Sequence, residues 1–233
     1  MVRAFPLAAA LGFWLLFFPA GAVAAGPTCH CFRDREYDPA NPDKSDEYLL
    51  ATAANSLLSA AYGVPKRGIV EARMSGISGE DLWISTYAAS RQGAEPAVLM
   101  SARTAAASWR DALRSLGGQL ESLGPRFVGA LAAGAGDAAL ARSAAAETLA
   151  ARLGTPWAEL EDLAGRGATL QETVLSSLIG VWSSRTAPEV YADVKSGKSG
   201  WSRLLATVNR IPKQMEVEVP KALRPEGSLI FRP

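Results

Sequence analysis

The stretch SDEYLLATAANSLLSAAYGVP, residues 45–65, decides the fold of this chain. Ser45 is a good N-cap residue, and two acidic residues follow it, where the helix dipole favours negative charge. Apolar residues then recur at helical spacing from Leu49 to Ala61. Gly63 suits the left-handed conformation that ends many helices, and Pro65 fits the first turn of another helix. The stretch therefore predicts two consecutive helices.

The same signals continue towards the C-terminus. The second helix is expected to stop at Gly76, and Ser78-Gly79-Glu80-Asp81 resembles a capping box that starts a third. Pro96 opens a fourth helix, and Trp109 belongs to a fifth. The chain is also rich in Ala and Leu with few β-branched runs, which favours helices. We therefore predict an all-α protein.

The order of these signals returns about 91 residues later. Gly63-Val64-Pro65 matches Gly154-Thr155-Pro156, and from Pro96 onward the offset becomes 92, as a one-residue insertion would produce. Further matched pairs are Gly76 and Gly167, Ser78 and Thr169, Asp81 and Glu172, Pro96 and Pro188, Trp109 and Trp201. The pairs predict two tandem helical repeat units, residues 45–118 and 137–210. The alternative is chance similarity between Ala-rich amphipathic helices.

Three segments lie outside these units. Residues 25–44 contain three prolines and are expected to be irregular, and residues 119–136 are expected to link the units. In residues 211–233, Met215 to Val219 alternate like a strand that has no sheet to join. We therefore predict an extended C-terminal tail.

The succession of a G-x-P turn, an apolar helix, a glycine, a Ser/Thr capping box and a helix carrying a tryptophan resembles uncharacterised exported bacterial proteins with tandem helical units. The resemblance covers most of the chain after the first 24 residues. Its motifs are structural, and it implies no activity.

The N-terminus has the pattern of a cleavable signal peptide, residues 1–24. Arg3 precedes the apolar run from Leu7 to Phe18, and Ala22-Val23-Ala24 is a suitable cleavage site. An uncleaved anchor is the alternative, although the run is shorter than the roughly 20 residues of a spanning helix. We expect a periplasmic or extracellular protein with no membrane span in the mature chain.

Charge argues against nucleic-acid binding. Loss of Arg3 with the signal peptide reduces the 24 basic residues by one, so that they equal the 23 acidic residues. Nucleic-acid-binding domains usually carry a basic excess or stripe, and no such stripe is evident in the sequence.

The triplet Cys29-His30-Cys31 contains both cysteines and the only histidine. Thiolates and imidazole bind zinc or copper, and Asp34, Glu36 or Asp38 could supply a fourth ligand. A disulfide is the other interpretation in an oxidising compartment, and free thiols without a role are a third. The spacing differs from that of a haem-attachment motif, so covalent haem is not expected.

Other motifs are incomplete. Gly197-Lys198-Ser199 resembles the end of a phosphate-binding loop, but Ala192 stands where the loop needs its first glycine. Gly134-Ala135-Gly136 lacks the strand–turn–helix context of a dinucleotide site. We therefore expect no nucleotide cofactor. The tryptophans Trp83, Trp109, Trp157, Trp182 and Trp201 fall within helical patterns and are expected to pack in the core.

The sequence thus predicts an exported, non-enzymatic helical-repeat protein that binds an unknown protein partner in the cell envelope through a helical surface. The alternative is a periplasmic metal-binding or redox accessory protein that uses Cys29, His30 and Cys31. The sequence itself identifies no catalytic residue.

Overall fold

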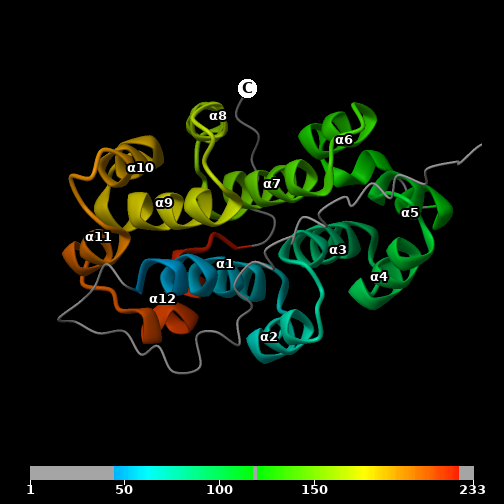
Figure 1. Ribbon diagram of the computed structural model, residues 1–233, viewed down its shortest axis with the longest axis horizontal. Coiled ribbons are helices and arrows are strands. Elements are labelled where there is room, and N and C mark those ends of the chain that lie inside the picture. Colours follow the sequence, from blue (N-terminus) through cyan, green and yellow to red (C-terminus); the bar gives the residue numbers. More distant parts are fainter. Residues whose placement is uncertain (1–44, 118–119, 226–233) are drawn as a thin grey trace, which may run out of the picture.

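The computed structural model describes residues 45–117 and 120–225, and over these ranges the chain is all-α, as predicted (Figure 1). Its α-helices are α1 Asp46–Tyr62, α2 Lys66–Met74, α3 Gly79–Gln92, α4 Pro96–Ala105, α5 Trp109–Ser115, α6 Pro125–Ala132, α7 Asp137–Thr148, α8 Trp157–Gly165, α9 Leu170–Ser183, α10 Ala187–Lys195, α11 Trp201–Thr207 and α12 Met215–Ala222. A π-helical turn, Leu149–Leu153, extends α7, and 3₁₀ turns at Leu120–Leu123 and Pro212–Gln214 precede α6 and α12.

Four helices form two central layers (Figure 1). α1 and α3 lie end to end in one layer, and α9 and α7 lie end to end in the other. As a result α1 packs against α9, and α3 packs against α7. The buried residues of α1 and α7 are mostly leucine and alanine, whereas those of α3 and α9 also include aromatic, β-branched and hydroxyl side chains. Small alanine side chains allow the two layers to approach closely, and the leucines fill the space between them.

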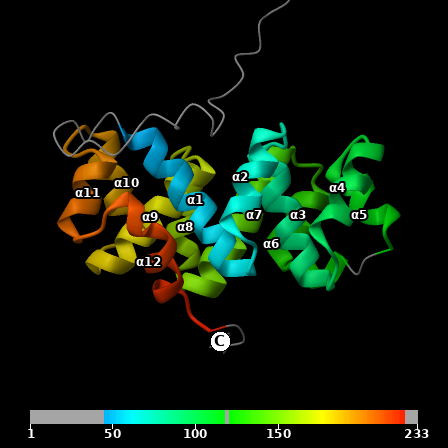
Figure 2. The same cartoon turned by 90° about the horizontal axis from the view of Figure 1, so that it is seen from below.

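The other helices cover the ends and edges of these layers. α10 packs against α9 and α8, whereas α4 packs against α3 and α5. α12 packs against α1, and α6 packs against α7. Seen from below, α12 lies across α1 and α9 (Figure 2). Every part of the described chain therefore contributes to one connected hydrophobic core.

The predicted extended tail is wrong over part of its length, because residues 215–222 form α12. Met215 and Val219 are buried, while Val217 between them is 56% exposed. The first and last residues of this five-residue run, Met215 and Val219, are four positions apart and so share one face of a helix. In α12, which packs against α1, this is the buried face. The predicted linker, residues 119–136, likewise contains a 3₁₀ turn and α6, with Phe127 and Leu131 buried.

Most predicted helix ends are confirmed. Ser78 caps α3, with its side chain accepting a hydrogen bond from the backbone N–H of Asp81. Thr169 and Glu172 form a full capping box at the start of α9. Ser45 does precede α1, but its side chain makes no capping hydrogen bond.

The predicted core role of the tryptophans is confirmed for three of them. Trp83, Trp109 and Trp201 are buried, whereas Trp157 and Trp182 are half-buried. The half-buried rings carry arginines, with Arg126 over Trp157 and Arg210 over Trp182.

The predicted signal peptide, residues 1–24, and the segment at residues 25–44 lie outside the described residues. Within the ranges that the structure describes, no helix combines the length and the apolar character needed to cross a membrane.

Candidate functional site

The predicted metal ligands Cys29, His30 and Cys31 lie outside the described residues. The same holds for Asp34, Glu36 and Asp38, the candidates for a fourth ligand. Among the described residues, no three His, Cys, Asp or Glu side chains come close enough to hold a metal ion. The triplet therefore remains a prediction from the sequence.

The two glycine-rich motifs lie in loops between helices. Gly197-Lys198-Ser199 joins α10 to α11, and the Lys198 ammonium is 2.9 Å from a carboxylate oxygen of Asp193. Gly134-Ala135-Gly136 joins α6 to α7. A helix, not a strand, precedes each loop, so neither has the setting that phosphate-binding loops require.

A groove of about 390 Å³ lies where α1, α2, α3 and α9 meet. One wall is a face of α1 that runs from Glu47 to Leu58. The other wall consists of Arg73 in the last turn of α2, the first turns of α3, and residues 169–171 at the start of α9. Ligand sites typically have volumes of this order.

The floor of the groove is apolar. Leu50, Leu58, Leu82 and Trp83 line it, together with two alanines of α1. Trp83 is only 3% exposed, yet its indole N–H has no hydrogen-bond partner among the described residues. The indole therefore offers an apolar surface at the base of the groove.

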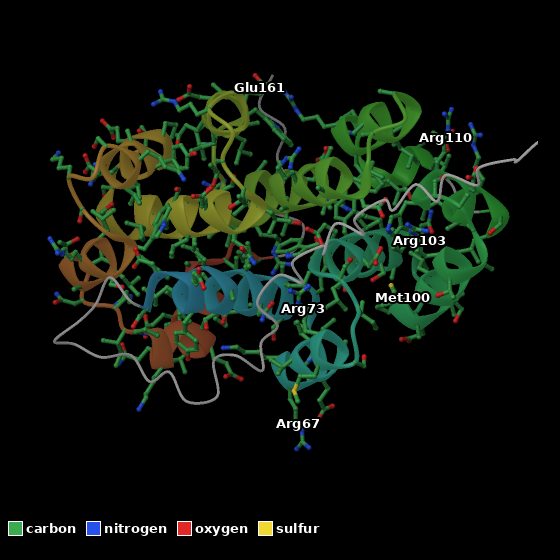
Figure 3. The ribbon with its side chains drawn as sticks, in the orientation of Figure 1. Arg67, Arg73, Met100, Arg103, Arg110 and Glu161 are labelled. Carbon is green, nitrogen blue, oxygen red and sulfur yellow. The ribbon has the colours of Figure 1, made fainter. Side chains whose placement is uncertain are left out.

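Arg73 is the basic residue that lines the groove. Figure 3 labels it near the junction of α1, α2 and α3. Its side chain makes no ion pair or hydrogen bond with any described residue, although the residue is half-buried. Its guanidinium lies directly over Gly79, since a Cβ added there would be 2.9 Å from Nη1. The absence of a side chain at Gly79 thus makes room for Arg73.

The rim of the groove carries both signs of charge. Glu47 and Glu80 are acidic lining residues, but neither forms an ion pair with Arg73 in the described structure. Asn55 and Gln171 add neutral donors and acceptors. The N-terminal ends of α3 and α9, which carry the positive ends of the helix dipoles, also reach the groove. An occupant with an acceptor group and an apolar side chain would satisfy these residues.

A second polar cluster is buried and serves the fold. The Glu147 carboxylate accepts a hydrogen bond from the backbone N–H of Arg126 at 3.1 Å, and so it caps α6 from α7. Burial raises the pKa of Glu147, against the effect of the backbone N–H groups that stabilise its charge. The Tyr87 hydroxyl donates to the carbonyl of Leu123, and burial raises the pKa of Tyr87 as well.

Comparisons with protein-family models, with curated proteins and with solved structures found no match to this chain.

Sequence reasoning did not predict the groove. Glu47, Ala54 and Leu58 share one face of a helix with spacings of seven and four, so this wall was visible in principle. The other wall combines residues of α2, α3 and α9 that lie up to 98 positions apart, between Arg73 and Gln171. Only the packing of the two layers brings these residues together.

Proposed function

We propose that this chain is an exported, non-enzymatic helical protein that binds a polypeptide segment of an envelope partner in the groove along α1. The observation that carries the proposal is the pair Arg73 and Trp83. Arg73 offers unpartnered donors beside the apolar floor to which Trp83 contributes. A partner segment with an apolar side chain next to a carboxylate would fill the floor and pair with the guanidinium.

We also infer that the chain is duplicated. The bounds of the helices support this, because α8 and α9 begin and end 91 residues after α2 and α3. α10 begins 91 residues after α4, and α11 begins 92 residues after α5. The left-handed residues Ser184 and Asn209 correspond to the left-handed glycines Gly93 and Gly117 at the same offsets.

Matching polar contacts support the same inference. The third residue of α3, Asp81, lies 3.8 Å from Arg103 in the last turn of α4. The third residue of α9, Glu172, lies 2.6 Å from Lys195 in the last turn of α10. Both pairs connect the start of the third helix of a unit to the end of its fourth.

The last helices extend the proposed units beyond the sequence prediction. α6 follows α5 as α12 follows α11, each after a 3₁₀ turn. The two proposed halves, α1 to α6 and α7 to α12, exchange their packing partners. α1 contacts α9 and α12, while α7 contacts α3 and α6. Each first helix thus packs against the third and sixth helices of the other half, an arrangement that a pseudo-twofold axis would produce.

Divergence between the two units supports a function for the groove. At the offset of 91, Glu47, Asn55 and Arg73 correspond to three alanines, Ala138, Ala146 and Ala164. Capping and core positions match between the units, whereas these groove positions do not. A binding role confined to the first unit explains why only that unit carries polar side chains at these three positions.

The proposal is tested by recovering partners from the native envelope with the tagged mature chain. We expect Arg73→Ala to reduce recovery of the partner by about tenfold or more, as loss of a charged hydrogen bond does. Arg67→Ala is the matched control, because Arg67 lies on the same helix, points outward (Figure 3) and is 88% exposed. Equal recovery by both variants, or no partner at all, would contradict the proposal.

A second candidate function rests on Cys29-His30-Cys31, whose residue types suit zinc or copper. The test is metal analysis and thiol titration of protein purified from the compartment to which it is exported. If this function is correct, Cys29→Ser with Cys31→Ser removes the bound metal or the redox activity. An unchanged metal content and redox behaviour would eliminate it. Sequencing the N-terminus of the same material tests cleavage after Ala24.

A further inference from the structure

We propose that residues 25–44 of the chain dock into the α1 groove of the same molecule and compete there with the partner. This inference rests on the groove proposed above as the binding site, and it concerns how that site is regulated. The described chain begins at Ser45, and Glu47, two residues later, already lines the groove. The segment therefore enters the structure at one end of the site.

The segment is long enough to fill the groove. From Glu47 to Leu58 the α1 wall rises about 1.5 Å per residue, which gives roughly 16 Å. An extended chain spans about 3.3 Å per residue, so about five residues cover that length. The segment has 20 residues, residues 25 to 44, and so it can turn back along α1 with residues to spare.

The chemistry of the segment complements the groove. Phe32 and Tyr37 are its large apolar side chains and match the floor beside Trp83. Asp34 and Glu36 supply the carboxylates that Arg73 lacks among the described residues.

The rim charges fit the segment as well. Arg33 and Arg35 alternate with the acidic residues of the segment, and they can pair with Glu47 and Glu80 on the rim. A mixed-sign segment therefore matches a mixed-sign rim.

Covalent linkage makes even a weak contact effective. A short tether gives an effective concentration of the order of millimolar, so a segment with millimolar affinity would occupy the groove much of the time. A partner must displace it, and its apparent affinity falls by the fraction of molecules in which the groove is free.

The experiment uses one native cysteine, Cys31, as the probe. In the mature chain, Cys29→Ser leaves Cys31 beside Phe32, and Asn55→Cys places a second thiol in the groove. The control replaces Asn55→Cys by Val217→Cys on α12, which packs against α1 and exposes Val217 outside the groove. The rate of disulfide formation is measured under mild oxidation and is divided by the reactivity of each introduced thiol towards a small reagent.

We expect the normalised rate at position 55 to exceed that at position 217 by about tenfold, because docking raises the local concentration of the Cys31 thiol. Arg73→Ala should bring the two rates together. Equal normalised rates without that substitution would overturn the inference. If partner recovery still depends on Arg73 in that case, the proposed function survives alone. If crosslinking favours position 55 but no partner is recovered, the inference survives and the partner proposal fails.

Discussion

Arg73 occupies a position that a glycine at residue 79 makes possible. The guanidinium lies over the first turn of α3, at the distance where a Cβ would collide with it. The guanidinium therefore lies in the groove without an acidic partner among the described residues, and it is available to pair with a ligand. At this scale the structure makes two predictions.

Gly79→Ala should displace the Arg73 guanidinium and weaken partner binding while the helices remain intact. Gly68→Ala on α2 is the matched control, because no atom lies within 4 Å of a Cβ there. We expect this control to bind normally and to gain about 0.5–1 kcal/mol of stability, since alanine favours a helix interior. Binding affinity and urea unfolding of both variants are the measurements. Normal binding by Gly79→Ala would contradict the role given to Arg73.

Glu147 should make folding stability depend on pH. Burial raises its folded-state pKa above the usual 4.5. The folded chain therefore favours the neutral form of Glu147. The resulting contribution to the free energy of unfolding is fully present below the unfolded-state pKa, and it is lost as the pH rises through the folded-state pKa. Between pH 7 and pH 4.5 the wild type should therefore gain stability relative to Glu147→Gln as pH falls. A difference between the two that is constant over this range would contradict the assignment.

At the scale of helices, the sequence predicted beginnings and ends well where local chemistry determines them. Ser78 and Thr169 cap helices because the capping side chain and its partner N–H lie three residues apart. The sequence did not predict α12. A short run of alternating valine and glutamate fits a strand and a helix equally well when the surface against which it packs, here α1, is unknown.

Substitutions in α12 separate the helical interpretation from the extended one. Val219→Ala should cost about 1–3 kcal/mol, as removal of buried methyl groups does, because Val219 is fully buried. Val217→Ala should change the stability by less than about 0.5 kcal/mol, as an exposed substitution does. Chemical unfolding of both variants is the measurement. Similar costs at the two positions would favour an extended strand or a disordered tail.

At the scale of the whole molecule, all-α architecture followed from composition and periodicity, whereas the site did not. The groove arises where the central layers meet α2, and no single stretch of sequence contains both of its walls. The exchanged packing of α1 and α7 is equally invisible in a local pattern, because α1 contacts helices more than a hundred residues away and α7 contacts the distant helix α3.

This exchange predicts that neither half of the molecule folds alone. Residues 25–134 would lack the helices that cover α1, and residues 135–233 would lack those that cover α7. We expect each fragment to show weak helical circular dichroism and no cooperative transition, and an equimolar mixture to recover both. A cooperative unfolding transition in either isolated fragment would show that the halves are independent domains.

Photocrosslinking in living cells tests whether the groove along α1 binds the partner. A photoreactive amino acid is placed at position 55 in the groove or at position 217 on α12 as the control. We expect one discrete covalent adduct from position 55, lost when Arg73→Ala is added, and none from position 217. Adducts of equal yield from both positions, or an adduct at position 55 that is unaffected by Arg73→Ala, would contradict it.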